Sequence, residues 1–359
     1  MRDEQRQGNY QSMRFDKVKG QEQIAREVGA NRRQRIVVAV KFVVTAALIS
    51  YVLRVANISE IRRVIGTAHW VWLAVAVVVL VGTQMLCALR WVLVSQPLQL
   101  NRSWHEFLRL YFLGAFFNTF LPTTIGGDVV KAYYLTRDTH QLARSTTSVF
   151  MDRNVGLGSL LIIGCVAATM NGATLRGMSI VPVLWLLLAG YCVSNAVLLY
   201  RRLHEMVRRK LRQLWFEGLD RRLGAMFGSL AMYRKNLLTM TVAAVFSVGI
   251  QLVNFIAVFF VGLAIGAPAA LKHYLVFLPV ITVMTMLPVS IGGLGVRESA
   301  LVTFFIPAGL TPEQSVTLGL LWHAVTVVAS LPGGWIYLTY RRNQAIPKLS
   351  GVLSAVDEP

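Results

Sequence analysis

Long apolar runs separated by short polar stretches dominate the chain. Six of these runs approach or exceed the roughly 20 residues that a helix needs to cross a hydrocarbon core about 30 Å thick. The spans predicted in this way cover residues 36–54, 70–95, 145–170, 179–200, 237–266 and 315–340. The polar ends, 1–35 and 341–359, are expected to be cytoplasmic tails on either side of one membrane domain at 36–340.

Two further apolar segments are interrupted by proline and glycine. The first runs over 106–121 to Pro122 and resumes as a short helix from about Asp128 to Leu135. The second covers 272–289 and 295–306. Because lipid cannot satisfy backbone groups freed by such breaks, these segments must be buried in protein or line a polar cavity. We interpret each as a re-entrant hairpin.

The two interruptions carry the same motif. Thr119–Lys131 reads TFLPTTIGGDVVK, and Thr285–Arg297, 166 residues later, reads TMLPVSIGGLGVR, with seven identities and no gap. Paired Gly/Pro-interrupted segments in corresponding halves are typical of a transporter's binding site. The alternative is that two independent loops share common turn residues.

Charge and composition favour a membrane protein over a nucleic-acid-binding one. The chain is 55% hydrophobic and 15% charged, and its formal net charge of +19 is concentrated in the N-terminal tail and the loop 201–236. This distribution follows the positive-inside rule and places both regions in the cytoplasm. The loop is predicted to form an amphipathic helix on an anionic leaflet; a solvated linker is the alternative.

The charge distribution then predicts opposite orientations for the two halves. The first repeat, about 70–170, has a hairpin entering from the cytoplasm, whereas the hairpin of the second, about 237–340, enters from outside. The predicted fold is an all-α polytopic membrane protein with an inverted repeat of span–re-entrant hairpin–span units. Such repeats underlie alternating access in many transporters.

Candidate site residues lie in and behind the motifs. Helix N-termini with free N–H groups and a fixed cation nearby suit phosphate, and the motif supplies Lys131 in one copy and Arg297 in the other. Intramembrane ionisable residues are functional candidates by default. The predicted substrate-binding set is Pro122, Thr124, Gly126, Gly127, Asp128, Lys131, Asp152, Arg153, Pro288, Ser290, Gly292, Gly293, Arg297 and Glu298.

Several of these charges have a structural alternative. Asp128 or Asp152 could neutralise an arginine that holds the repeats together, and His323 is expected to be a hydrogen-bonded core histidine. Arg90, near the end of its span, is predicted to anchor a lipid headgroup. Cys87, Cys165 and Cys192 lie in apolar runs and read as core residues. No metal or cofactor motif is found, and no phosphate-binding loop for ATP.

The segments LPTTIGGDVVKAYYL, SVFMDRNVGLG and LPVSIGGLGVRE resemble the flippase-like family built on the transmembrane region of lysylphosphatidylglycerol synthases. The resemblance covers about 36–340. It implies movement of lipids between leaflets. The chain stops after the membrane part, so the resemblance does not extend to aminoacylation, and it leaves the lipid open.

The sequence therefore predicts a translocase in the plasma (inner) membrane rather than an enzyme. Its partners would be a phospholipid or a lipid-linked substrate with an anionic phosphate headgroup. The alternative is a membrane-embedded enzyme or accessory subunit acting on a polyprenyl-linked sugar or an aminoacyl lipid, with Asp128 and Asp152 as acid/base groups. The direction of transport, its energy coupling and the oligomeric state stay open.

Overall fold

The computed structural model describes residues 43–52, 54–121, 126–171, 174–175, 178–199, 226, 228–286, 290 and 293–343. Both predicted tails fall almost wholly outside these residues. So do most of the basic loop 201–236 and the start of the first predicted span.

Five of the described helices are long and apolar enough to cross a membrane. They are α3 (Trp70–Ser95), α6 (Leu142–Met170), α7 (Val181–Leu199), α10 (Leu237–Ala264) and α13 (Pro312–Asn343). The helix at Val43–Val52 is apolar but shorter. The prediction of an all-α polytopic membrane protein is confirmed.

The two interrupted segments form pairs of shorter helices. The first pair is α4 (Trp104–Phe120) with α5 (Gly126–Thr139), and the second is α11 (Leu271–Met286) with α12 (Val296–Phe305). α4 starts at a capping box, in which the Ser103 hydroxyl and the Glu106 carboxylate satisfy each other's backbone N–H groups. α4 ends just before Pro122, where the missing N–H and the proline ring disfavour further helix.

Three small elements were not predicted. α2 (Ile58–Gly66) is a short helix capped by Asn57, whose side chain accepts from the Ser59 N–H at 2.9 Å. A single turn, η1 (Gln96–Leu98), follows α3, and a two-stranded antiparallel turn, β1 (Thr174–Leu175) with β2 (Met178–Ser179), joins α6 to α7.

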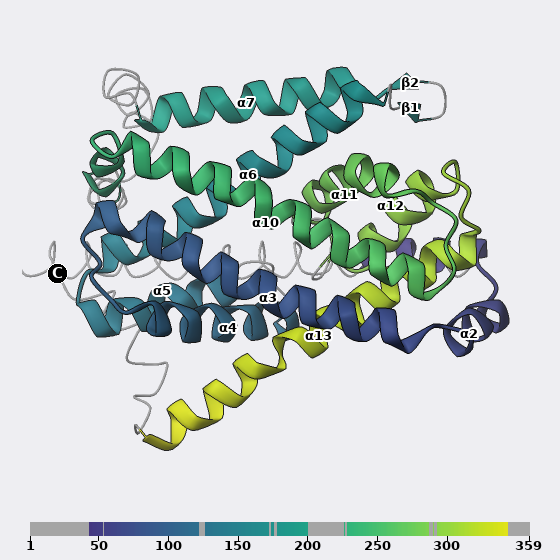
Figure 1. Ribbon diagram of the computed structural model, residues 1–359, viewed down its shortest axis with the longest axis horizontal. Helices are drawn as coiled ribbons and strands as arrows, with labels where there is room; N and C mark the ends of the chain where they lie inside the picture. The colour runs from purple at the N-terminus through teal and green to yellow at the C-terminus, as the bar shows by residue number, and fades with distance from the viewer. Residues whose placement is uncertain are drawn as a thin grey trace, which may run out of the picture.

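The two hairpins lie toward opposite ends of the long axis of the molecule (Figure 1). α4 and α5 occupy the end at which α3 finishes, and α11 and α12 occupy the end at which α10 finishes. Three crossing helices, α6, α7 and α10, separate the hairpins along the chain. α3 packs along α10, and α13 packs against α4, so helices of the second half of the chain pack directly against helices of the first half.

Each hairpin has its own apolar core. Trp91, Phe107, Leu113 and Leu135 are buried around α4 and α5. Around α11 and α12 the core is aromatic, and Tyr274 and Phe277 make edge contacts with Phe305. Each hairpin therefore packs against the spanning helices through a separate cluster of buried residues.

Candidate functional site

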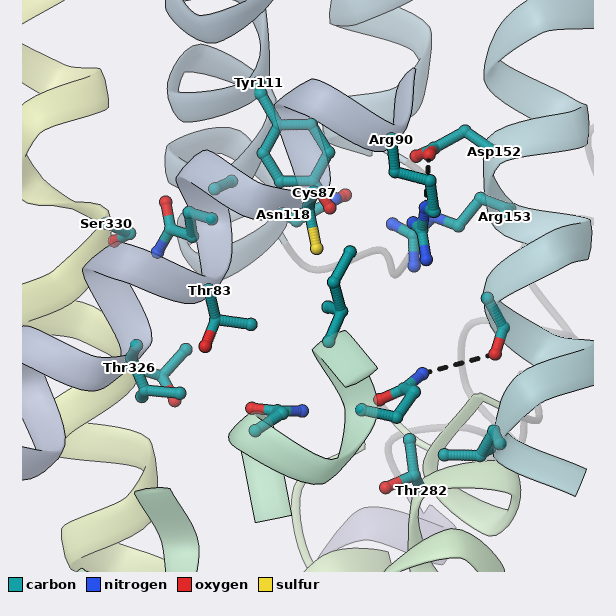
Figure 2. Close-up of a pocket in the computed structure, with 18 of the residues that line it drawn as sticks. Thr83, Cys87, Arg90, Tyr111, Asn118, Asp152, Arg153, Thr282, Thr326 and Ser330 are labelled. Carbon is teal, nitrogen blue, oxygen red and sulfur yellow. Dashed lines mark hydrogen bonds and ion pairs between the residues drawn. The ribbon is translucent and has the colours of Figure 1, made fainter. Parts of the chain in front are cut away.

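A cavity of about 420 Å³ lies between the two hairpins and is shown in Figure 2. Its walls come from α3, α4, α5, α6, α10, α11, α12 and α13. Lys131 of the first hairpin and Arg297 of the second both line it. The two cations that the repeated motif places at equivalent positions therefore face one common space.

A second cavity, of about 550 Å³, continues from the first and contains the open ends of both hairpins. The end of α4, at Phe120 and Leu121, lines it together with the end of α11, at Thr285 and Met286. The two cavities share eight lining residues: Asn118, Thr119, Arg153, Thr282, Met286, Arg297, Trp322 and Thr326. Described residues that flank the two helix breaks, Leu121 in the first hairpin and Met286 and Gly293 in the second, thus line one common cavity.

Lys131 is buried and fully engaged. Its Nζ lies 3.1 Å from Asp128 Oδ1, one helical turn earlier on α5. The ammonium also sits over the rings of Tyr111, at 4.6 Å, and Trp91, at 5.2 Å. Gly114 of α4 leaves room for its stem, because a Cβ there would lie 2.6 Å from Lys131 Cγ.

Asp128 neutralises two cations. Its second oxygen, Oδ2, accepts from Arg153 Nε at 2.7 Å, so the carboxylate bridges α5 and α6. Arg153 lines both cavities. Asp128 therefore does pair with an arginine, as the structural alternative expected, and this arginine is Arg153. The same carboxylate also contacts Lys131.

The prediction that Arg90 anchors a lipid headgroup is wrong. Arg90 is only 5% exposed, and its Nε lies 2.9 Å from Asp152 Oδ1 on α6. Its Nη1 donates to Ser247 Oγ of α10 at 2.7 Å. The ion pair joins α3 to α6, and the hydrogen bond adds α10. Asp152 thus pairs with Arg90 rather than with the neighbouring Arg153.

In the second hairpin, Arg297 contacts three side chains. Its Nε lies 3.4 Å from Glu298 Oε1, its Nη2 lies 3.4 Å from His323 Nδ1, and its guanidinium sits 5.4 Å from the Trp322 ring. Glu298 also accepts from the Gly295 N–H at 2.8 Å and so caps α12. Glu298 orients the cation from behind, whereas Arg297, Trp322 and His323 reach the cavities.

The charges around the cavities leave a positive excess. Four cations line the first cavity: Arg90, Lys131, Arg153 and Arg297. Three carboxylates pair with them: Asp152, Asp128 and Glu298. With His323 neutral, this described group carries a net charge of +1, because Asp128 serves two cations. A site of this kind favours a single negative charge.

The described glycines of the two motifs lie in different surroundings. Gly127 is packed against α4, where a Cβ would overlap the Gly114 carbonyl oxygen and lie 2.7 Å from Asn118. Its N–H donates to Asn118 Oδ1 at 2.8 Å and is not free for an anion. Gly126 begins α5, and Gly293, which has a positive φ of 78°, lines the second cavity.

Four of the predicted residues, Pro122, Thr124, Pro288 and Gly292, lie outside the described residues. Ser290 is buried, and its hydroxyl has no hydrogen-bond partner among the residues that the structure describes.

Sequence reasoning missed several cavity residues. These are mainly uncharged polar residues on the spans and hairpins: Thr83, Gln84, Asn118, Gln251, Asn254, Thr282, Thr326 and Ser330. Their positions inside apolar runs were the available signal, because polar side chains at membrane depth usually face the protein interior. In the described part of the chain, no group of three His, Cys, Asp or Glu residues could hold a metal ion.

Long apolar helices around a cavity that charged and polar side chains help to line define an integral membrane protein of the polytopic α-helical class. The chain belongs to the family described as the lysylphosphatidylglycerol synthase TM region, which matches residues 38–333. This confirms the resemblance drawn from the three motifs. The family is the membrane part of a synthase, and the match includes no catalytic domain.

Two proteins of Methanothermobacter thermautotrophicus strain Delta H, each named UPF0104 membrane protein, are similar to this chain. One is 22% identical over 324 residues, which cover 83% of this chain and 91% of the relative. The other is 20% identical over 265 residues, which cover 70% and 78%. No solved structure matches the chain.

Proposed function

We propose that the protein is a lipid translocase that moves a lipid with an anionic phosphate headgroup between the leaflets of the membrane. The observation that carries the proposal is the shared cavity, in which Lys131 and Arg297 face one space with a net charge of +1. The headgroup would cross through the cavity while the acyl chains stay in lipid.

The arrangement of the hairpins supports a mechanism. We propose that the two span–hairpin–span units form an inverted repeat and that they open the cavity to one leaflet at a time. The hairpins lie toward opposite ends of the molecule (Figure 1). Residues next to each break, Leu121 and Gly293, line the second cavity. Movement of one unit against the other would then change which end of the cavity is open.

The enzyme alternative is less well supported. It needs Asp128 and Asp152 as acid/base groups, but Asp128 is bound by Lys131 and Arg153, and Asp152 by Arg90. A carboxylate that already balances buried cations is poorly placed to accept and return protons. These contacts favour a structural and charge-balancing role for both residues.

Reconstituted vesicles test the proposal. A fluorescent anionic phospholipid is added, its leaflet is followed by an impermeant quencher, and its identity is checked by chromatography. A translocase changes the leaflet and leaves the lipid intact, whereas an enzyme alters the molecule. Movement no faster than in protein-free vesicles would contradict the proposal.

We also propose that the protein lies in the plasma (inner) membrane with both termini in the cytoplasm. Among the described residues, the segments near α4, α5 and the start of α10 carry Arg102, Arg109, Arg137, Arg144, Arg234 and Lys235, and the segments around α2 and the start of α11 carry Arg54, Arg62, Arg63 and Lys272. Helices α5 and α2 lie at opposite ends of the molecule (Figure 1). The excess at the first end agrees with the positive-inside rule. The segment 201–236 would add to it and contact an anionic leaflet.

Single cysteines at Asn101 and Thr311, each introduced into a chain whose native cysteines have been replaced, test this orientation. An impermeant thiol reagent added to intact cells should label the cysteine at Thr311 and spare the one at Asn101. Labelling of both cysteines from the same side would contradict the proposal that the two hairpins have opposite orientations.

A further inference from the structure

The cavity has two chemically different sides. Figure 2 shows Arg90, Asp152 and Arg153 on one side and Thr83, Thr326 and Ser330 on the other. The three residues of the second side come from α3 and α13 and are uncharged. A phosphate needs only the cations, so the neutral polar wall indicates that the ligand has a second part.

The hydroxyl groups on this wall already donate their hydrogens within the protein. Each donates to a carbonyl of its own helix, Thr83 to Val79, Thr326 to Trp322 and Ser330 to Val327, all at 2.8 Å. A hydroxyl has one hydrogen and two lone pairs. These three residues therefore offer acceptors to the cavity rather than donors.

Gln84 adds an unpaired acceptor. Its Nε2 donates to the Ala329 carbonyl at 3.2 Å, and because a carbonyl can only accept, this contact fixes which way the amide is turned. The amide oxygen, Oε1, is buried and has no hydrogen-bond partner among the described residues. A buried acceptor left in this state favours a ligand that brings a donor.

Hydroxyl groups and ammonium groups are both hydrogen-bond donors. The charges that line the cavities determine which of the two is favoured. Asp152 is the one carboxylate among the described residues that line the two cavities, and Arg90 holds it at 2.9 Å. An ammonium in the cavity would meet no free carboxylate and would add to a net positive charge. A hydroxyl avoids both penalties.

We infer, resting on the proposed function, that the lipid is a phosphodiester of net charge −1 whose headgroup ends in neutral hydroxyls, as in a polyol or a sugar. The phosphate lies toward Lys131 and Arg297. The hydroxyls donate to Gln84, Thr83 and Ser330. Headgroups ending in an aminoacyl ammonium are disfavoured.

Four fluorescent lipids in vesicles with the purified protein test this inference. Phosphatidylglycerol has the charge and the hydroxyls, phosphatidylmethanol has the same charge without hydroxyls, the lysyl ester of phosphatidylglycerol adds ammonium groups, and phosphatidylethanolamine is zwitterionic. The initial rate for phosphatidylglycerol should exceed the other three rates by about tenfold, the effect of one or two hydrogen bonds.

Substitution of Gln84 separates recognition from folding. Gln84→Leu should lower the phosphatidylglycerol rate to that of phosphatidylmethanol and leave the phosphatidylmethanol rate unchanged, whereas a folding defect would slow both. Gln84→Glu adds a carboxylate and should raise the rate for the lysyl ester. Thr241→Val, at an exposed position of α10, is the control.

The outcomes distinguish this inference from the proposed function. If the lysyl ester moves as fast as phosphatidylglycerol, or if phosphatidylmethanol does, the hydroxyl headgroup is wrong and the translocase stands. If none of the four lipids moves faster than in protein-free vesicles, the translocase itself is wrong.

Discussion

The two hairpins carry the same thirteen-residue motif but fold it differently. In the first hairpin, α5 begins at Gly126 and includes both glycines of the pair. In the second, α12 begins only at Val296, after a turn in which Gly293 and Gly295 have positive φ values of 78° and 79°. The helix therefore starts four positions later relative to the motif.

Two substitutions between the copies account for this difference. Asp128 of the first copy corresponds to Leu294, and Val129 corresponds to Gly295. An acidic residue in the first turn stabilises a helix through the helix dipole, and α5 has one where the second copy has leucine. Glycine at 295 permits a left-handed turn that valine would resist.

The position of the cation survives these changes. Lys131 and Arg297 both reach the first cavity although one lies in the second turn of its helix and the other in the first. Each is balanced by a nearby carboxylate, Asp128 in one case and Glu298 in the other. The comparison indicates that the repeat preserves the place of the charge more strictly than the backbone around it.

The largest expected effect comes from a substitution at Gly127 in the first hairpin. Gly127→Leu forces a side chain into the backbone of α4, which cannot move aside as a flexible side chain would. Overpacking with extra methylenes costs about 1–3 kcal/mol, and this substitution should exceed that range. We expect no folded protein by size-exclusion chromatography in detergent.

Two further leucine substitutions show whether this effect belongs to the first hairpin. Gly293→Leu places a leucine at a positive φ, at a cost of about 1–2 kcal/mol, and should lower Tm without preventing folding. Gly190→Leu, at an exposed site on α7 with no atom within 4 Å of the added Cβ, should change nothing. Equal losses at Gly127 and Gly293 would contradict the difference between the hairpins.

The second effect concerns charge balance. Asp128→Asn leaves the buried Lys131 and the partly exposed Arg153 without their shared carboxylate. Breaking a buried ion pair by removing one partner typically costs about 3–5 kcal/mol. We expect a large fall in the apparent Tm measured in detergent micelles.

The corresponding change in the second hairpin is Glu298→Gln. It removes one ion pair with Arg297, but the glutamine oxygen can still accept from the Gly295 N–H. The loss of stability should therefore be smaller than at Asp128. If Glu298→Gln is the more damaging of the two, the bridging role of Asp128 is wrong.

The third prediction tests the shared cavity directly and concerns transport rate. Lys131→Gln and Arg297→Gln each remove one of the paired cations. A charged hydrogen bond lost in a buried site costs about 1.5–3 kcal/mol, roughly a ten- to hundredfold loss of rate. Initial rates for a fluorescent phosphatidylglycerol in vesicles at matched protein levels measure it.

Arg63→Gln is the control for that measurement, because Arg63 is exposed on α2 and its ion-pair partner among the described residues is the neighbouring Glu60. It should keep the full rate. Equal losses from Arg63→Gln and the two hairpin variants would remove the paired-cation mechanism, and so would unchanged rates in both hairpin variants.

The sequence predicted the membrane helices well because hydrophobicity over about 20 residues is a strong local signal. The span expected at 70–95 is α3, Trp70–Ser95, and both hairpins were found from their proline and glycine breaks. The start of α12 was also close, at 296 against an expected 295.

What the sequence could not show were partners distant in the chain. Arg90 was assigned to the membrane surface from its place near the end of a span, but its partner Asp152 lies 62 residues away. The motif likewise indicated a break at Gly127 without indicating that Gly114 and Asn118 pack against it. Such contacts depend on how α3, α4 and α6 are arranged, which no local pattern encodes.

The smallest expected effect concerns the cap of α5. Asn118 Oδ1 accepts from the Gly127 N–H at 2.8 Å, so Asn118→Ala leaves a helix N-terminal donor without its partner. Loss of a helix cap typically costs about 1 kcal/mol, and we expect a small fall in Tm.

The equivalent position in the second hairpin is Met284, which is 37% exposed and whose thioether is at best a weak acceptor, so Met284→Ala should leave Tm nearly unchanged. Because Asn118 also lines both cavities, Tm rather than transport rate is the appropriate measurement. Equal shifts in Tm for the two variants would mean that the cap does not distinguish the hairpins, and the earlier start of α5 would then rest on Asp128 alone.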